Sequence, residues 1–261
     1  MRIELTLVGM GTGNPQHITQ EGVQALRAAD VILLPRKGEE KAALAAARLE
    51  VCRQVWPQGD GPRWAWFDMP DRHAASTTDA YRAEVQRWHD AIAQAWRDAL
   101  CAALPQGGRV AMLVWGDPSI YDSTLRIAQR LALRVPVTTR VVPGVSALQA
   151  LAAAHAIALT ELAAPLLVTS ARWLRENGWP EGIPTLAVML DGEGVFQALA
   201  APDVYIWWGA YLGLPQQLLC AGPLASVGAD IAALRRQARA QHGWIMDTYL
   251  LQRRMPDAPQ E

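Results

Sequence analysis

The chain has 261 residues, of which 51% are hydrophobic and 19% charged, and its formal net charge is −1 at pH 7. This composition excludes a disordered chain, and the near-zero charge argues against the broad electrostatic contact that nucleic acids require. No apolar run reaches the roughly 18 residues of a membrane span, and three widely spaced cysteines without a Cys-x-x-Cys pair favour a cytoplasmic protein with no bound metal.

The first half of the chain predicts alternating strands and helices. Residues 3–8 form a mostly apolar run that ends in glycine, as a buried parallel strand does. The clearest helix is expected over 79–104, where apolar residues recur on one face. The other expected strands are 31–35, 63–67, 110–115 and 138–142, and the other expected helices are 21–29, 42–55, 123–133 and about 147–155. This alternation is typical of an α/β architecture.

The second half predicts short strands separated by helix-like pieces. Periodicity weakens near 157–165, so we expect an N-terminal domain over 1–157, a C-terminal domain over 165–255 and a frayed polar tail over 256–261. The expected strands are 166–169, 185–190, 204–208 and 244–251, and the expected helices are 195–200 and 225–241. The hairpin-like spacing of the strands favours a mixed sheet.

Two glycine-rich turns each follow directly after an expected strand. They are Gly9-Met10-Gly11-Thr12-Gly13-Asn14-Pro15 and Gly116-Asp117-Pro118-Ser119. Ligands of open α/β sheets bind at the carboxyl ends of strands, so the two turns suggest one pocket. The first turn fails the dinucleotide fingerprint, because Gly-x-Gly-x-x-Gly would need glycine where Asn14 stands. An ordinary tight turn is the alternative for each.

Four motifs in a fixed order carry a family resemblance. They are Val-Gly-x-Gly-x-Gly-x-Pro at 8–15, Ala-Asp-Val-Ile at 29–32, Gly-Asp-Pro-Ser-Ile-Tyr at 116–121 and Val-Val-Pro-Gly-Val-Ser-Ala at 141–147. In this spacing the chain, to about residue 225, resembles the tetrapyrrole methylase family. The resemblance implies two α/β domains, each a mixed sheet flanked by helices, with S-adenosylmethionine held in the cleft between them. It also implies a homodimer and S-adenosylhomocysteine as product.

Three later segments, 189–192, 208–215 and 242–251, resemble a deacetylating branch of that family. This implies methylation of precorrin-5 at C1 with loss of acetate, giving precorrin-6A in cobalamin biosynthesis. Water adds to the acetyl carbonyl, acetate departs, and the ring carbon that keeps the electron pair attacks the sulfonium methyl.

Carried over position by position, the resemblance also implies which residues contact each ligand. The cofactor contacts are Trp115, Gly116, Asp117, Ile120, Tyr121, Val145, Ser146, Met189, Leu190, Trp208, Gly209, Ala210, Asp247 and Thr248. The loop that contributes Gly11, Gly13 and Pro15 is implied to face the tetrapyrrole. Because the substrate carries many carboxylates, we expect Arg36, Lys37 and Arg72 to bind them, the alternative for each being a solvated surface charge.

Deacetylation calls for a general base and for a donor to the carbonyl oxygen. His17 and Asp30 are the candidate bases and Tyr121 is the candidate donor. Each has a structural alternative: His17 caps the loop, Asp30 is a solvated acid at a strand entrance, and Tyr121 packs on adenine. His89 is expected at the surface of the long helix, and Arg235 is expected to be a solubilising charge that complements the dipole of its helix.

Two other functions stay open. One is a methyltransferase of the same fold that acts on a different precorrin, on rRNA or on a diphthamide precursor, although the near-zero charge weighs against RNA. The other is a binding module that keeps the pocket without the chemistry. The expected partners are therefore a small tetrapyrrole and a second copy of the chain, and neither a nucleic acid nor a membrane.

Overall fold

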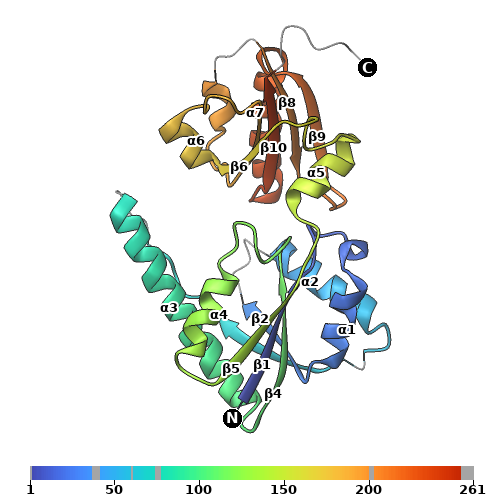
Figure 1. Ribbon diagram of the computed structural model, residues 1–261. Coiled ribbons are helices and arrows are strands. Elements are labelled where there is room, and N and C mark those ends of the chain that lie inside the picture. The colour runs from blue at the N-terminus through green and yellow to red at the C-terminus, as the bar shows by residue number, and fades with distance from the viewer. Residues whose placement is uncertain (1, 37–41, 60, 74–77, 200–202, 254–261) are drawn as a thin grey trace. The chain divides into compact units, whose positions relative to one another are not determined.

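The computed structural model describes residues 2–36, 42–59, 61–73, 78–199 and 203–253 (Figure 1). The chain separates into two compact units, Met1–Val145 and Ser146–Glu261. Each unit has its own sheet and its own hydrophobic core. Within the described ranges, none of the helices is both long and apolar enough to cross a bilayer.

The first unit contains a five-stranded sheet in the order β3-β2-β4-β1-β5. Its strands are β1 (Arg2–Gly9), β2 (Val31–Arg36), β3 (Arg63–Asp68), β4 (Gly107–Val114) and β5 (Val137–Val142). Every described pairing between these strands is parallel, whereas the sequence analysis expected each of the two sheets to be mixed. The reason is that a helix follows each of the first four strands and returns the chain to the same edge.

Helices cover both faces of the first sheet. The helices α1 (Gln20–Ala28) and α2 (Ala42–Val55) pack on one face, and α3 (Thr78–Ala103) and α4 (Thr124–Ala132) pack on the other. The helix that follows β1 therefore covers one face of the sheet, while the helix that follows the neighbouring strand β4 covers the other. Such a reversal opens a crevice at the carboxyl ends of the two strands, where ligands of α/β sheets bind.

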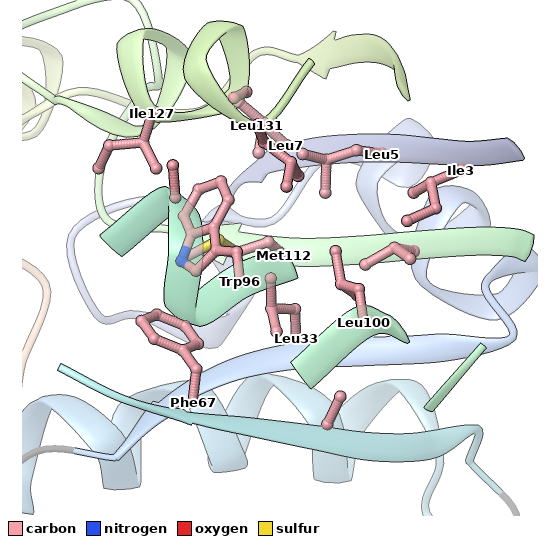
Figure 2. Packing of buried hydrophobic residues seen from close by; sticks show 14 of the residues in the cluster. Ile3, Leu5, Leu7, Leu33, Phe67, Trp96, Leu100, Met112, Ile127 and Leu131 are labelled. Atoms are coloured by element: carbon pink, nitrogen blue, oxygen red, sulfur yellow. The ribbon is translucent and has the colours of Figure 1, made fainter. Parts of the chain in front are cut away.

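Trp96 of α3 anchors the core between that helix and the sheet. Its ring meets Phe67 edge to face, with 5.9 Å between the ring centroids. Figure 2 shows Trp96 packed with Phe67 and Met112, with Ile127 and Leu131 of α4 nearby. A Trp side chain buries about 150–250 Å², so this contact fixes α3 on the sheet.

His89 lies one turn before Ile92 and Ala93 on the buried stripe of α3 and is only 2% exposed, so its expected surface position is wrong. Neither of its ring nitrogens has a hydrogen-bond partner among the described residues. Burial, aided by the nearby Arg130 and Arg126, lowers the pKa of His89. The imidazole is therefore neutral at physiological pH.

The second unit is a mixed five-stranded sheet in the order β6-β7-β10-β8-β9. Its strands are β6 (Leu166–Ser170), β7 (Thr185–Met189), β8 (Val204–Ala210), β9 (Leu218–Pro223) and β10 (Asp247–Arg253), and its helices are α5 (Ala147–His155), α6 (Ala171–Asn177), the 3₁₀ turn η3 (Val195–Ala198) and α7 (Leu224–His242). Strands β6 and β7 are parallel and the other pairs are antiparallel, as the strand spacing predicted. The sequence did not predict α6 or β9.

The boundary between the units lies earlier than expected. It falls after Val145 rather than within 157–165, because α5 packs against β8 and β10 of the second sheet. His155 Nε2 lies 3.0 Å from the carbonyl oxygen of Trp208. A Cβ placed on Gly209 would lie 2.9 Å from Leu151 Cδ1. Helix α5 is therefore packed against the sheet of the second unit.

Candidate active site

Three loops at the carboxyl edge of the first sheet are joined through their backbones. The Gly116 N–H donates to the Gly11 carbonyl at 2.8 Å, and the Gly11 N–H donates back at 3.3 Å. A Cβ on Gly144, in the loop after β5, would lie 2.3 Å from the Gly116 carbonyl oxygen, and one on Gly9 would lie 2.5 Å from the Gly144 nitrogen. The structure thus brings both glycine-rich turns together, and the missing side chains are what allow the loops to meet.

Asp117 holds two of these loops together. Its Oδ2 accepts the Gly144 N–H at 2.8 Å, and its Oδ1 accepts the N–H of Ser119 at 2.8 Å and the hydroxyl of Ser119. Partial burial alone would raise the pKa of Asp117, but these hydrogen bonds hold the pKa below its ordinary value. The carboxylate is therefore ionised, and it orients backbone amides of the loops.

The first loop contains two buried polar atoms without a hydrogen-bond partner among the described residues. They are Oγ1 of Thr12, a residue only 3% exposed, and Nδ1 of His17. Most buried polar atoms in proteins have a partner, so these two mark a place for a polar ligand or a water molecule. Burial lowers the pKa of His17, which leaves a neutral imidazole at pH 7 that can accept a proton.

Tyr121 follows the second loop and is 43% exposed. Its φ of 49° is unusual for a bulky residue and is the kind of outlier that gathers at ligand sites. Trp115 and Ile120, which precede Tyr121 in the chain, are partly buried. Ser146 is the N-cap of α5, and its Oγ accepts the Leu148 N–H at 3.2 Å.

Asp30 lies at the opposite edge of the sheet, so its expected role as a base is wrong. It directly precedes β2, and its carboxylate accepts the Arg109 backbone N–H at 2.8 Å and Arg109 Nη2 at 3.0 Å, at the amino end of β4. The side-chain hydrogen bond from Arg109 lowers the pKa of Asp30. This carboxylate joins two strand entrances, far along the strands from the glycine loops.

The expected carboxylate-binding cations have different settings. Arg36 ends β2 at the loop edge and pairs with Asp68 at 3.8 Å, both side chains being largely exposed. The Arg72 guanidinium is exposed and lies 5.6 Å from the Trp88 ring centroid. Lys37 lies outside the described residues.

Arg48 of α2 is a cation at this edge that the sequence analysis missed. Its Nε donates to the Leu113 carbonyl at 3.4 Å and its Nη1 to the Leu44 carbonyl at 3.1 Å. Burial lowers the pKa of Arg48, and it forms no ion pair within the described part of the chain. The signal was present, because Arg48 follows Leu44 by four residues on the buried face of the helix.

One edge of the second sheet gathers the remaining expected cofactor residues. Asp247 pairs with Ala210 and Thr248 with Gly209, where β8 ends and β10 begins, and Met189 ends the neighbouring strand β7. The side chains of Trp208, Ala210 and Thr248 are buried, and Thr248 Oγ1 donates to the Val188 carbonyl at 2.8 Å. A Cβ on Gly209 would lie 2.7 Å from Leu212, so packing explains this glycine. Because these side chains are buried, the residues offer a ligand their backbone. Leu190 is 63% exposed and offers its side chain.

Asp247 is buried and paired inside the second unit. Its Oδ2 lies 2.8 Å from Arg235 Nε and accepts Trp208 Nε1 at 2.8 Å. Arg235 is only 8% exposed, so its expected surface role is wrong. The spacing of Ile231, Arg235 and Ala238 places Arg235 on the apolar face of α7, a signal that the sequence analysis overlooked.

Residues 4–228 match the family model described as Tetrapyrrole (Corrin/Porphyrin) Methylases. The chain belongs to the tetrapyrrole methylase family. It is accordingly a methyltransferase, and its two sheets flanked by helices are the architecture of that family.

Two full-length relatives narrow the comparison within the tetrapyrrole methylases. The chain is 40% identical over 252 residues to "Precorrin-6A synthase [deacetylating]" from Sinorhizobium sp, which covers 96% of this chain and 95% of the relative. It is 35% identical to a cobalamin synthesis related protein (CobF) from Corynebacterium diphtheriae, whose structure matches with a TM-score of 0.80 over 97% of this chain and 99% of that chain.

A more distant tetrapyrrole methylase shares the fold. Uroporphyrin-III C-methyl transferase from Thermus thermophilus, solved in complex with S-adenosyl homocysteine, matches with a TM-score of 0.55 and 18% identity over 95% of this chain and 97% of that chain.

Across the described ranges, no three His, Cys, Asp or Glu side chains are grouped so that they could hold a metal ion.

Proposed function

We propose that the protein binds S-adenosylmethionine and methylates precorrin-5 at C1 with loss of acetate, giving precorrin-6A and S-adenosylhomocysteine in cobalamin biosynthesis. The observation that carries this proposal is the 40% identity to a deacetylating precorrin-6A synthase over 96% of the chain. The likeness to a CobF structure over 97% of the chain supports the same reaction. We also propose a cytoplasmic homodimer that binds neither nucleic acid nor membrane; the net charge of −1 supports the absence of nucleic-acid binding.

The residues at the two loop edges fit a nucleoside cofactor. In the second unit, the exposed Leu190 offers an apolar surface for a base, and the backbone of 208–210 ends at the same edge of the sheet, with the start of β10 between them. In the first unit, Gly116 and Tyr121 lie at the loop edge, where Asp117 holds the backbone. When bound, S-adenosylmethionine supplies a methyl group that is already activated by its sulfonium.

The first glycine loop supports a role in holding the macrocycle. Gly11, Gly13 and Pro15 surround Thr12, whose buried Oγ1 lacks a partner in the described part of the chain. We assign Arg36 and Arg48 to the substrate carboxylates, because both are cations near the carboxyl end of the sheet and Arg48 forms no ion pair among the described residues, where it donates to the Leu113 and Leu44 carbonyls.

His17 is the group that we assign as general base for the attacking water. Its lowered pKa keeps the ring neutral at pH 7, and it lies against Gly11, since a Cβ on that glycine would be 2.5 Å from His17 Cβ. We assign Tyr121 as the donor to the carbonyl oxygen, because its exposed ring follows the second loop.

The test combines the purified protein with methyl-labelled S-adenosylmethionine and precorrin-5. The expected result is one acetate released for each labelled tetrapyrrole, with no release when precorrin-5 is omitted. Label in RNA or in another protein would contradict the proposal. So would a labelled tetrapyrrole without released acetate, because methylation would then not be coupled to deacetylation.

A further inference from the structure

The turn after β7 is closed by one buried carboxylate. Asp191 Oδ1 accepts the N–H groups of Glu193 at 3.1 Å and Gly194 at 2.6 Å, and Oδ2 accepts the Val195 N–H at 2.8 Å. Oδ2 also accepts the Tyr249 hydroxyl at 2.7 Å. Burial and the neighbouring Asp191 raise the pKa of Tyr249, so it stays a donor. The carboxylate thus fixes the backbone that follows Leu190.

Leu190 has a backbone conformation that a leucine rarely adopts. Its φ of 58° lies in the left-handed region, where Cβ crowds the following carbonyl. The side chain is 63% exposed, so burial of apolar surface does not explain the conformation. A bulky residue held in this region by its surroundings points to a function for the side chain that it presents.

Arg235 connects this turn to the end of β8. From α7, its Nη2 donates to the Asp191 carbonyl. Its Nε lies 2.8 Å from Asp247 Oδ2, the oxygen that also accepts Trp208 Nε1. Gly194 leaves room for the guanidinium, because a Cβ there would lie 2.5 Å from Arg235 Nη1. One side chain therefore fixes the turn after β7 and the end of β8, two strand ends of the same edge that β10 separates.

Stability alone is a poor explanation for this ion pair. Burying two charges carries a desolvation penalty that can exceed their attraction, and apolar replacements of buried ion pairs are often as stable. Burial raises the pKa of Asp247 even though Arg235 is beside it, which reflects that penalty. What the pair supplies, and an apolar contact would not, is a fixed direction for the groups that it joins.

We propose that Arg235 is a positioning residue for nucleoside binding, which holds the Leu190 turn through the Asp191 carbonyl and the end of β8 through Asp247. This rests on the proposed function, in which these two strand ends meet S-adenosylmethionine. Tyr249 also holds the Leu190 turn, through the hydrogen bond of its hydroxyl to the Asp191 carboxylate. Neither residue touches the reacting atoms.

The test measures binding of S-adenosylhomocysteine by calorimetry, together with the melting temperature and steady-state kinetics. Arg235→Met is compared with Arg236→Met, which changes the exposed neighbouring arginine. Ile231→Ala, in the core of the same helix, serves as a second control that loses stability without touching the network. Tyr249→Phe removes one hydroxyl and provides an independent variant should Arg235→Met fail to fold.

We expect Arg235→Met to raise the Kd of S-adenosylhomocysteine and the KM of S-adenosylmethionine by about ten-fold or more, with the KM of precorrin-5 within about two-fold of the unmodified protein. Tyr249→Phe should raise the same two constants by a smaller factor, while Arg236→Met and Ile231→Ala leave them unchanged.

Unchanged constants in a folded Arg235→Met, or in Tyr249→Phe if that is the variant that folds, would overturn the positioning role alone. An equal rise in Ile231→Ala would also overturn it, because lost stability would then explain the effect. If the unmodified protein takes up no S-adenosylhomocysteine, the proposed function fails and the positioning role fails with it.

Discussion

Replacing Leu190 with glycine and with alanine should separate backbone strain from ligand binding. The left-handed conformation destabilises a non-glycine residue by about 1–2 kcal/mol, and glycine loses about 0.4–1 kcal/mol more backbone entropy on folding than alanine does. Because φ is 58° at this residue, the strain exceeds the entropy term. Leu190→Gly should therefore be more stable than Leu190→Ala by about 1 kcal/mol, which reverses the usual order of the two substitutions.

Both variants should bind S-adenosylhomocysteine more weakly, and by the same factor. Complete burial of a leucine side chain contributes about 1.5–3 kcal/mol, and 63% of this one is exposed before a ligand covers it. Covering that fraction contributes about 1–2 kcal/mol, so the Kd should rise roughly ten-fold. Leu186→Ala, at a fully buried position of the strand β7 that precedes Leu190, is the control that loses stability, by about 2–5 kcal/mol.

Urea unfolding followed by circular dichroism gives the stability of each variant, and calorimetry gives the Kd. If Leu190→Ala proves more stable than Leu190→Gly, the reasoning about strain is wrong. If both variants bind S-adenosylhomocysteine as tightly as the unmodified protein, Leu190 is not part of the nucleoside surface, whatever the stabilities.

Three further substitutions test other residues. His89→Leu should raise the free energy of unfolding by about 1 kcal/mol near pH 7.5, because it removes a buried ring with no hydrogen-bond partner among the described residues. Because the pKa of His89 is lowered in the folded protein, the unfolded chain binds more protons below about pH 6.5. The gain in free energy of unfolding should therefore be larger near pH 5.5 than near pH 7.5. Equal gains in urea titrations at the two pH values would refute this. His17→Ala should lower kcat by about 100-fold or more with the Kd of S-adenosylhomocysteine unchanged, and normal turnover would remove His17 as the base. Arg36→Glu should raise the KM of precorrin-5 by about ten-fold, less so at high salt, and an unchanged KM would reject its role.

Local sequence patterns predicted most of the elements but not the direction of every pairing. The apolar run at β1 and the one-sided helix α3 follow from periodicity, which depends only on neighbouring residues. The seven residues of α6 are too few to show a helical period, and β9 contains Gly222 and Pro223, which disfavour a strand. The parallel character of the first sheet follows from the helices that the sequence predicts in each crossover, and the expectation of a mixed sheet overlooked it.

The parts of the candidate site that backbone motifs define could be predicted from the sequence. The parts that depend on side-chain packing could not. The two glycine-rich turns meet as the order of strands and turns indicated. Asp30 could have been set aside from the sequence, since a residue that precedes a parallel strand lies at the edge opposite the loops that follow the strands. The spacing of Arg48 from Leu44 indicates the buried face of its helix, but its partner was not predictable. The limited pairing of β2 with β4 leaves the Leu113 carbonyl to be met by a side chain, and no local pattern predicts that contact.

The charged residues at both loop edges bind backbone or one another, and this bears on how a cofactor is recognised. The Asp117 carboxylate accepts loop N–H groups, and the Asp191 carboxylate accepts three N–H groups of its own turn. Arg235 meets a carbonyl and Asp247. Each of these charged groups is bound mainly by other protein groups. Their effect on a ligand is therefore to hold the neighbouring backbone in place. A sulfonium nucleoside would then meet bare backbone and the apolar Leu190, and recognition would depend on shape more than on charge.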